Sequence, residues 1–497
     1  MKSIVIIALP LIVLFLTSII LLIAIIIWRR NNRVCTVVSL IGLSIAIVSI
    51  IVYKDTKLEL VSTLLYIDSY SLFISTLVLL ASLITTIFTY LWLCFSDLAD
   101  QGEIFLLILI ATLGGVLLAS ASNLSSFLIG IELITVPLFG ITGYTYNKII
   151  YLESSIKYTL LSALTSSFLI FGIALIYAQT GYLNYSQISR FMSEDGFLLL
   201  PQPLLLLGFG LMMVSIGFKL SLVPFHQWTA DIYQKSPIPA VMFLATSSKI
   251  AIFGATTRLL IDLHLLDNKA IYSLLSIMAF ISILIGNLIA IFQLNIKRLL
   301  AYSSISHLGY LWIALICVHT NKYFSLETIN ISLVSYLLSN LGFFGILLLI
   351  SIIYHNHDYM DNIDSYPYRG LFLHHPILSL GMTIMILSLC GIPITLGFIS
   401  KFYIIIMSIM SHSWWLTVSL LIGSIIGIYY YLRVIAYLYL SSVQSLEPEN
   451  LVLSSPQFYC IWHIGAILVF LIAVSICILG IFPQYIINIA KLSNKII

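Results

Sequence analysis

Four charged side chains lie deep inside long apolar segments of the sequence: Glu132, Lys219, Lys249 and Lys401. A charged residue at the centre of a membrane span costs about 2.5–3.5 kcal/mol on insertion scales. A lysine near the end of a span avoids this cost by extending its flexible stem to the interface. Depth therefore separates charges that anchor a helix from charges that need another explanation, and this set predicts proton binding and release.

Buried lysine suits proton transfer because its affinity for the proton depends strongly on its surroundings. The pKa of lysine in water is near 10.4; burial lowers this pKa by up to several units and a neighbouring carboxylate raises it. A Glu–Lys pair that forms and breaks can therefore load and unload a proton, and hydroxyls and water can relay it. Glu132 and Lys219 fall on the fifth and seventh predicted helices, so such a pair is a hypothesis that the sequence leaves open.

Glu132 lies about eight residues into its helix, or roughly 12 Å deep, beyond the easy reach of a short carboxylate to either end. The competing interpretation is a structural carboxylate held by a hydroxyl or a lysine. Lys219 lies beside a predicted helix break, because Pro224 lacks an N–H and clashes with the carbonyl of Leu220. The freed carbonyls can hold water or a cation, which is tolerated only inside the protein.

The other two lysines also have distinctive local sequences. Lys249 lies roughly 17 Å from the start of its helix, near the middle of the bilayer, and hydroxyl side chains precede it. Lys401 follows a second Gly/Pro break at residues 391–397, and the apolar stretch continues to Met410. It either remains within the bilayer or extends to the interface.

Three further residues are weaker candidates for a proton path. Lys157 starts its helix after Glu153 and is shallower, so anchoring at the interface competes closely with function. His226 and His307 lie deeper, but a lone buried histidine is more often a hydrogen-bonded core residue.

The remaining ionisable and sulfur-containing groups are interpreted as structural residues without a role in proton transfer or metal binding. Charges near helix ends are interpreted mainly as anchors: Arg258, Lys297, Arg298 and Arg433. The residues His355, His357 and Asp358 are metal-ligand types in an ordinary polar loop, and we expect no metal there. Six scattered cysteines with no Cys-x-x-Cys argue against an iron–sulfur cluster, a structural zinc and a disulfide framework.

Composition requires a membrane around these charges. Of the 497 residues, 61% are hydrophobic and 8% charged, against roughly 25% charged in a soluble domain. The fold class predicted is an all-α polytopic membrane protein of about fourteen helices. The spans are expected near 3–28, 34–53, 71–94, 104–121, 124–145, 154–178, 200–223, 238–261, 271–292, 298–318, 327–354, 371–403, 413–440 and 460–487. The net charge of +3 is too small to suggest nucleic acid as a partner.

The first apolar block is predicted to be a retained helix rather than a signal peptide. It is longer than the roughly 7–15 residues of a signal core, and no small-x-small site follows it. Arg29, Arg30 and Arg33 come next, which indicates a cytoplasmic loop. With an even number of spans, both termini are then expected to face the outer side of the membrane.

The sequence also contains an internal repeat. Ser162 within 161–166 matches Ser335 within 334–339, an offset of 335 − 162 = 173 residues, and the same offset relates Phe225 to Phe398. The copies lie five helices apart, so we expect two inverted five-helix repeats with broken helices, a layout of many transporters. Chance similarity between apolar helices is the alternative. The single membrane domain 1–497 is accordingly divided into N-terminal helices (1–103), a first repeat (104–262), a second repeat (271–440) and a C-terminal loop and helix (441–497).

The segments that carry the buried charges resemble a known family. They are similar to the antiporter-like membrane subunits of respiratory NADH:quinone oxidoreductase (complex I). Among these they most resemble the bacterial N subunit, the counterpart of mitochondrial NADH dehydrogenase subunit 2. The resemblance runs nearly end to end, and its most specific stretch is 295–310. The other carrying segments are 130–134, 155–159, 217–228, 248–254 and 391–402.

The resemblance implies roles for individual residues. It implies that Glu132 and Lys219 form a switching pair and that Lys249 is the central relay. Lys401 is then the residue of the outlet half of the proton path, and Lys157 corresponds to a further lysine of the family. It implies no cofactor bound by this chain, with FMN, iron–sulfur clusters and quinone in partner subunits. The partners implied are other membrane-arm subunits, including two further antiporter-like subunits. Related subunits end in a longer helical extension, whereas this sequence stops at Ile497, which favours the N subunit.

Two alternatives to this proton-translocating subunit remain open at the level of the sequence. One is a subunit of a multi-subunit cation/proton antiporter of the same superfamily. The other is a structural membrane subunit without an ion path.

Overall fold

A computed structural model describes residues 8–52, 59–60, 64–95, 101–144, 149–194, 203–353, 368–440 and 456–493 of the chain. In this part of the chain helices dominate, and the strands are a two-residue antiparallel pair, β1 (Glu59–Leu60) and β2 (Tyr66–Ile67). Eleven helices are long and apolar enough to cross a membrane, and four shorter apolar helices accompany them. The protein is therefore an all-α polytopic membrane protein, as predicted.

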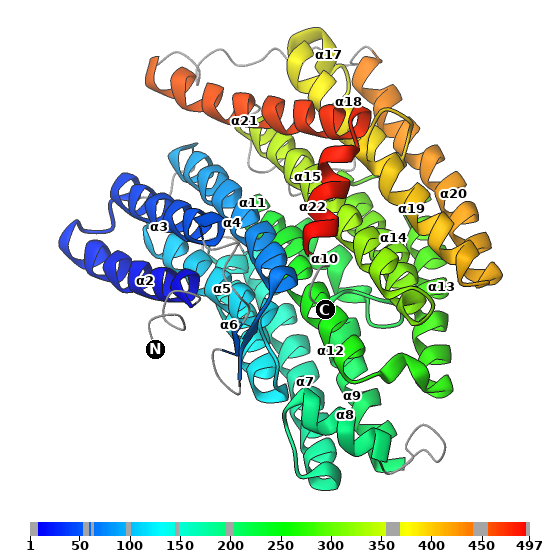
Figure 1. Cartoon of the computed structure of the whole chain (residues 1–497). Helices are drawn as coiled ribbons and strands as arrows, with labels where there is room; N and C mark the ends of the chain where they lie inside the picture. Colours follow the sequence, from blue (N-terminus) through cyan, green and yellow to red (C-terminus); the bar gives the residue numbers. More distant parts are fainter. Residues whose placement is uncertain are drawn as a thin grey trace.

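The helices run along the whole described chain (Figure 1). In the first half they are α2 (Leu9–Ile27), α3 (Asn32–Val52), α4 (Ser69–Phe95), α5 (Glu103–Ala119), α6 (Leu124–Thr142), α7 (Ile149–Thr180), α8 (Tyr185–Glu194), α9 (Pro203–Lys219), α10 (Gln227–Lys235), α11 (Ile238–Phe243), the π-helical turn η1 (Leu244–Ser248) and α12 (Lys249–Asp262). In the second half they are η2 (Leu265–Asp267), α13 (Lys269–Ile291), α14 (Ile296–Ile316), η3 (Cys317–His319), α15 (Lys322–Ile353), α17 (Leu371–His374), α18 (Pro376–Cys390), α19 (Leu396–Met410), α20 (Trp414–Tyr439), α21 (Pro456–Ile481) and α22 (Gln484–Ser493).

Two predicted spans are each divided in the structure. The predicted span 371–403 contains α18 and α19, separated at residues 391–395, where Gly391 adopts a left-handed φ of +80° and Pro393 offers no N–H. The predicted span 460–487 contains α21 and α22, which meet at Pro483. Two short helices, α8 and α10, lie where no span was expected.

The helix bounds agree with the predicted repeat. The helices α7 and α15 are both 32 residues long, and their first and last residues are 173 positions apart (322 − 149 and 353 − 180). Each is preceded by a closely packed helix hairpin, α5 with α6 and α13 with α14. Each is followed by a broken helix, α9 with α10 and α18 with α19. The exact domain boundaries and the inverted orientation of the copies stay predictions.

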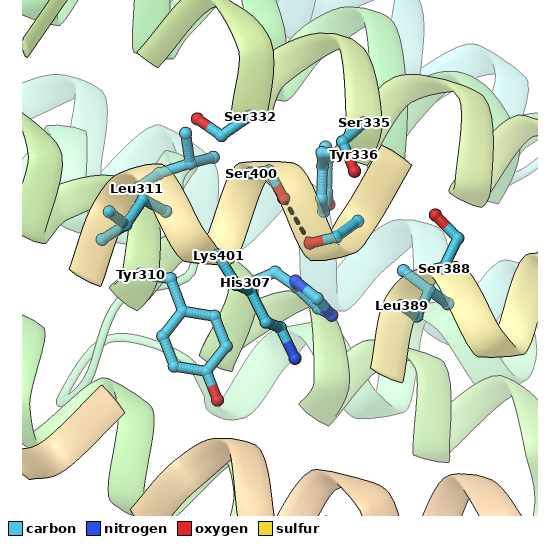
Figure 2. A pocket seen from close by; sticks show the side chains of 12 residues that line it. His307, Tyr310, Leu311, Ser332, Ser335, Tyr336, Ser388, Leu389, Ser400 and Lys401 are labelled. Carbon is cyan, nitrogen blue, oxygen red and sulfur yellow. Dashed lines mark hydrogen bonds between the residues drawn. The ribbon is translucent and has the colours of Figure 1, made fainter. Parts of the chain in front are cut away.

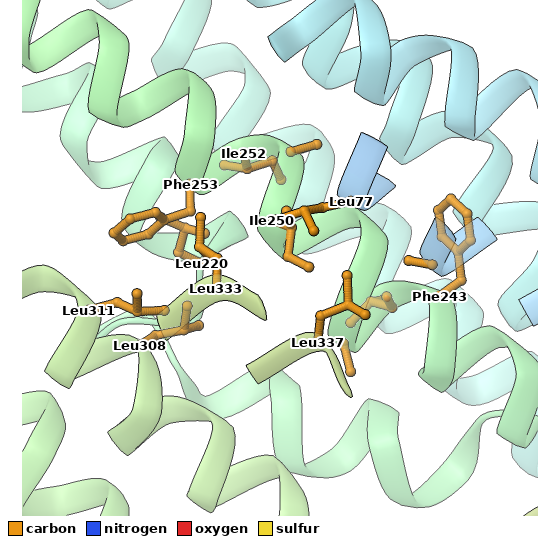
Figure 3. Packing of buried hydrophobic residues seen from close by; sticks show 14 of the residues in the cluster. Leu77, Leu220, Phe243, Ile250, Ile252, Phe253, Leu308, Leu311, Leu333 and Leu337 are labelled. Carbon is orange, nitrogen blue, oxygen red and sulfur yellow. The ribbon is translucent and has the colours of Figure 1, made fainter. Parts of the chain in front are cut away.

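The centre of the molecule lies where the two halves meet. The 18-residue windows with the highest burial are in the segment 238–262 (100% buried), α14 with η3 (94%) and α15 (89%), whereas that of α2 is 28% buried. Ile250 and Phe253 of α12 pack there against leucines of α14 and α15 such as Leu308 and Leu337 (Figure 3). This dense apolar packing surrounds the buried lysines and fixes the helices that carry them.

Candidate proton-transfer site

Lys219 is the last residue of α9 and is 4% exposed. Its ammonium group donates a hydrogen bond to the Ser162 hydroxyl of α7. The end of a helix is favourable for a cation because the carbonyl groups of the last turn have no partner within the helix. The predicted break follows directly, since the chain leaves the helix after Lys219 and resumes helical structure at Gln227.

The break at residues 220–226 connects Lys219 to the next lysine. Ser221 adopts a left-handed backbone conformation with φ of 56°. Its hydroxyl accepts a hydrogen bond from Lys249 Nζ at 2.9 Å. The break therefore places a hydroxyl between the two lysines, which lie 30 residues apart in sequence.

Lys249 begins α12 directly after the π-helical turn η1 and is 1% exposed. A π-turn inside a helix often marks a functional site because it shifts the register of the side chains. Besides Ser221, Lys249 Nζ donates to the Ser304 hydroxyl of α14 at 3.0 Å. It lies 5.5 Å from the centre of the Tyr233 ring. Lys249 thus joins the first half of the chain to the second through hydroxyl groups alone.

Two tyrosines continue the series beyond Lys249. The hydroxyls of Tyr233 and Tyr336 both lie near that of Ser304. Both oxygens are buried, and neither has a hydrogen-bond partner among the described residues. Buried hydroxyls without a partner are unusual, and they are available to a water molecule or to a rearranged network.

A cavity of about 20 Å³, measured as the space that the centre of a water molecule can occupy, lies beyond Tyr336 (Figure 2). Its lining includes Tyr336 and Ser335 of α15, His307 of α14, and Lys401 of α19. Polar groups line it from the four helices α14, α15, α18 and α19, and about 10–15 Å³ of such space is enough for one water molecule. The cavity can therefore hold water between Tyr336 and Lys401.

Lys401 donates from Nζ to the carbonyl of Cys390, the last residue of α18, at 2.8 Å. Lys401 is 9% exposed, so it does not extend to the interface. The aliphatic part of the Lys401 side chain packs against Gly391. A Cβ added at Gly391 would clash with it, because it would lie only 2.7 Å from Lys401 Cδ. The second break thus holds the Lys401 cation on a carbonyl at the end of α18, whereas Lys219 at the first break binds a serine hydroxyl.

His307 lies beside Lys401 in the same cavity (Figure 2). Its Nε2 lies 3.2 Å from the hydroxyl of Tyr431 on α20. The structure therefore joins His307 to the lysine series. His226 lies in the first break and is 9% exposed, but its Nδ1 has no hydrogen-bond partner in the described part of the chain.

Glu132 lies on α6, half-buried, and does not contact Lys219. Both residues are described, and they form no ion pair in this conformation. One carboxylate oxygen accepts a hydrogen bond from Thr135 at 3.3 Å, and the other is buried without a partner among the described residues. The charge of Glu132 nevertheless acts on Lys219, so the two lie within electrostatic range.

Lys157 stands apart from the series. Its side chain is 47% exposed and pairs with Glu153 one turn earlier, at 2.6 Å. The loop residues His355, His357 and Asp358 lie outside the described residues.

The interpretation of Arg258 as an anchor at a helix end was wrong. Arg258 is 4% exposed and forms a buried ion pair with Asp68, so its side chain is held inside the protein and does not extend to the surface. Lys297 is also buried, at 4% exposed. Sequence reasoning missed Asp68, although an acidic residue directly before an apolar span was a usable signal. It also missed Ser304 and Tyr336, which look like ordinary helix residues until the helices are packed.

A protein-family model described as "NADH:quinone oxidoreductase/Mrp antiporter, TM" matches residues 121–427, which is more than half of the chain. The chain belongs to this family. The buried lysines, Glu132 and His307 all fall within the matched region.

Three solved structures are similar to this family member over almost its whole length. A chain of respiratory complex I from Thermus thermophilus, solved with bound aureothin, is 29% identical with a TM-score of 0.76, covering 97% of this chain and 99% of that one. A chain of the membrane-bound sulfane sulfur reductase, an archaeal respiratory membrane complex, is 21% identical with a TM-score of 0.79, covering 99% and 96%. A chain of the Mrp complex from Dietzia sp. is 17% identical with a TM-score of 0.81, covering 98% and 97%. The last two show the fold alone.

Proposed function

We propose that this chain is a proton-translocating, antiporter-like subunit of the membrane arm of NADH:quinone oxidoreductase, of the N type. The observation that carries the proposal is the series of three buried lysines, Lys219, Lys249 and Lys401, which crosses the two halves of the chain. Their described partners are hydroxyls and a carbonyl rather than carboxylates. A charged amine with only neutral partners in a buried site is relieved of its desolvation cost when it releases its proton.

The proton moves stepwise in this proposal. Lys219 passes its proton toward Lys249 through Ser221 and water, and Lys249 passes it through Ser304 and Tyr336 to the cavity beside His307. Lys401 takes it up there. Glu132 acts as the switch, because a carboxylate that approaches Lys219 favours its charged form and one that withdraws favours release.

The energy for transport comes from partner subunits. Moving one charge against 100 mV takes about 2.3 kcal/mol. We propose that quinone reduction supplies it in subunits that hold FMN, iron–sulfur clusters and quinone, and that two further antiporter-like subunits lie in the same arm. The near-complete mutual coverage with a complex I chain at 29% identity supports this assignment. We place the chain in a bacterial plasma membrane with both termini on the outer side.

The test uses the intact complex reconstituted in vesicles. Lys219→Ala and Lys249→Ala are each expected to lower quinone-linked proton uptake at least about a hundredfold, since proton transfer by a positioned side chain contributes about 10²–10⁴-fold. Native gels check that the complex assembles, and Lys269→Ala is the control because Lys269 is exposed at the start of α13. Assembly together with full proton uptake in both variants would mean a structural subunit without an ion path.

A second candidate is a subunit of a cation/proton antiporter, favoured by the family description, which names the Mrp antiporter beside NADH:quinone oxidoreductase. Copurification decides between the two. Flavin and iron–sulfur absorbance in the purified native complex is expected for the first function, and sodium-dependent proton exchange without either cofactor is expected for the second.

A further inference from the structure

The short helix α10 follows the break between Lys219 and Lys249 and is fastened at its start. The Trp228 indole donates to the Phe218 carbonyl at 3.0 Å, directly before Lys219. Its ring stacks on Phe218 with centroids 5.0 Å apart, and on Tyr158 of α7 with centroids 5.3 Å apart. This end of α10 is therefore tied to the helix that ends at Lys219.

The other end of α10 is tied to the start of α7 by charge. Lys235 Nζ lies 2.7 Å from Glu153 Oε1, and Lys157 Nζ lies 2.6 Å from the same oxygen. The Ser154 hydroxyl also donates to the carbonyl of Lys235 at 3.3 Å. One carboxylate oxygen thus holds two lysines, one from its own helix and one from α10.

The opposite side of α10 is tied to α14. Arg298 Nη1 donates to Gln234 Oε1 at 3.2 Å and lies 3.7 Å from Asp231 Oδ1. Because α14 also carries Ser304 and α7 carries Ser162, α10 links the two helices that hold the hydroxyl partners of Lys249 and Lys219.

We propose that Glu153, Lys157 and Lys235 form an ionic clamp that fixes α10 and so sets the separation of Lys219 from Lys249. In this inference, which rests on the proposed function, Lys157 is a positioning residue and carries no proton along the path. The separation matters because a misplacement of 1 Å at a reacting centre can cost about a hundredfold in rate. The clamp residues are 30–47% exposed, and exposed ion pairs are individually weak, so the expected effect is smaller than the loss of a relay lysine.

Proton uptake by the reconstituted intact complex tests the clamp. Glu153→Gln and Lys235→Met are each expected to slow uptake about threefold to tenfold, and Lys157→Gln is expected to slow it no more than these. The charge-swapped double variant Glu153→Lys with Lys235→Glu is expected to recover at least about half of the wild-type rate. A purely structural role predicts no such recovery in the rate per assembled complex. Lys269→Gln, with its exposed lysine on α13, is the matched control.

The outcomes separate the clamp from the proposed function. The clamp inference fails if Lys157→Gln abolishes uptake as fully as Lys249→Ala does, because Lys157 is then a relay residue. It also fails if Glu153→Gln and Lys235→Met both transport at the wild-type rate while Lys249→Ala does not. If Lys249→Ala itself transports normally, the proposed function fails first. Should one variant not assemble, the other single variant and the swap still decide the question.

Discussion

Buried positive charge occurs in two contrasting arrangements in this protein. Near one end of α12, Arg258 pairs with the carboxylate of Asp68 and donates to the carbonyls of Tyr66 at 3.0 Å and Ala119 at 3.3 Å. At the other end of the same helix, Lys249 is also buried, but its hydrogen-bond partners among the described residues are serine hydroxyls. Arg258 is neutralised by a carboxylate, whereas Lys249 is held by neutral hydroxyl groups.

The difference indicates what each site can do. Arginine keeps its proton in proteins, and a counter-charge beside it makes the pair static. Lysine is a compact charge that loses its proton readily when buried, and the neutral amine still hydrogen-bonds to a hydroxyl. The pair at Arg258 is suited to fixing α12, and the site at Lys249 is suited to passing a proton. Variants that give one site a feature of the other test this difference.

Lys249→Arg is expected to have the largest effect on proton uptake. The variant keeps a buried positive charge at the centre of the path, but the guanidinium cannot release its proton. We expect proton uptake by the assembled complex to fall at least about a hundredfold. Lys269→Arg serves as the control at an exposed position. Uptake above half of the wild-type rate in Lys249→Arg would show that charge alone, without proton release, is sufficient.

Arg258→Met should affect stability rather than transport. Removing one partner leaves Asp68 buried and unpaired, which costs about 3–5 kcal/mol. We expect a lower yield of assembled complex and a lower thermal midpoint, while the rate per assembled complex remains close to that of the wild type. The double variant Arg258→Met with Asp68→Leu should recover much of the stability. A normal yield combined with a large loss of rate would place Arg258 on the proton path.

The sequence alone identified Lys249 correctly but misinterpreted Arg258, and the difference has a physical reason. Lys249 was identified because a charge near the middle of a span is costly wherever the helix packs. Arg258 was misinterpreted because a charge near the end of a helix often extends to the surface, and only packing shows that this side chain turns to the 66–68 segment and the last residue of α5. The break beside Lys219 was predictable from Pro224, since proline acts locally. Serine and tyrosine partners such as Ser304 were not, because they belong to helices far apart in sequence.

Ser304→Ala should have an intermediate effect. It removes one of two hydroxyl partners of Lys249, a group that also lies near the Tyr336 hydroxyl. A hydrogen bond to a charged group contributes about 1.5–3 kcal/mol, so we expect uptake to fall about tenfold or somewhat more. Ser276→Ala is the matched control, because the buried Ser276 hydroxyl bonds only within its own helix, to the Ser273 carbonyl at 2.8 Å. Equal rates in the two variants would exclude Ser304 from the path.

Thr135→Val should have the smallest effect and tests the Glu132 carboxylate, which the proposal assigns as the switch for Lys219. Glu132 is held by Thr135 at 3.3 Å and is not paired with Lys219, unlike Asp68 with Arg258. Without the Thr135 hydroxyl, Glu132 is free to settle against Lys219, and the site comes to resemble the static pair at Arg258. This long hydrogen bond lies at the weak end of the range of about 0.5–1.5 kcal/mol, so we expect proton uptake to slow only about twofold to threefold. Thr142→Val on the same helix is the control, because its hydroxyl bonds to the Phe139 carbonyl at 3.1 Å. If Glu132→Gln slows uptake strongly while Thr135→Val matches the control, then Glu132 acts on Lys219 without moving toward it, and the switching pair has to be replaced by a fixed charge.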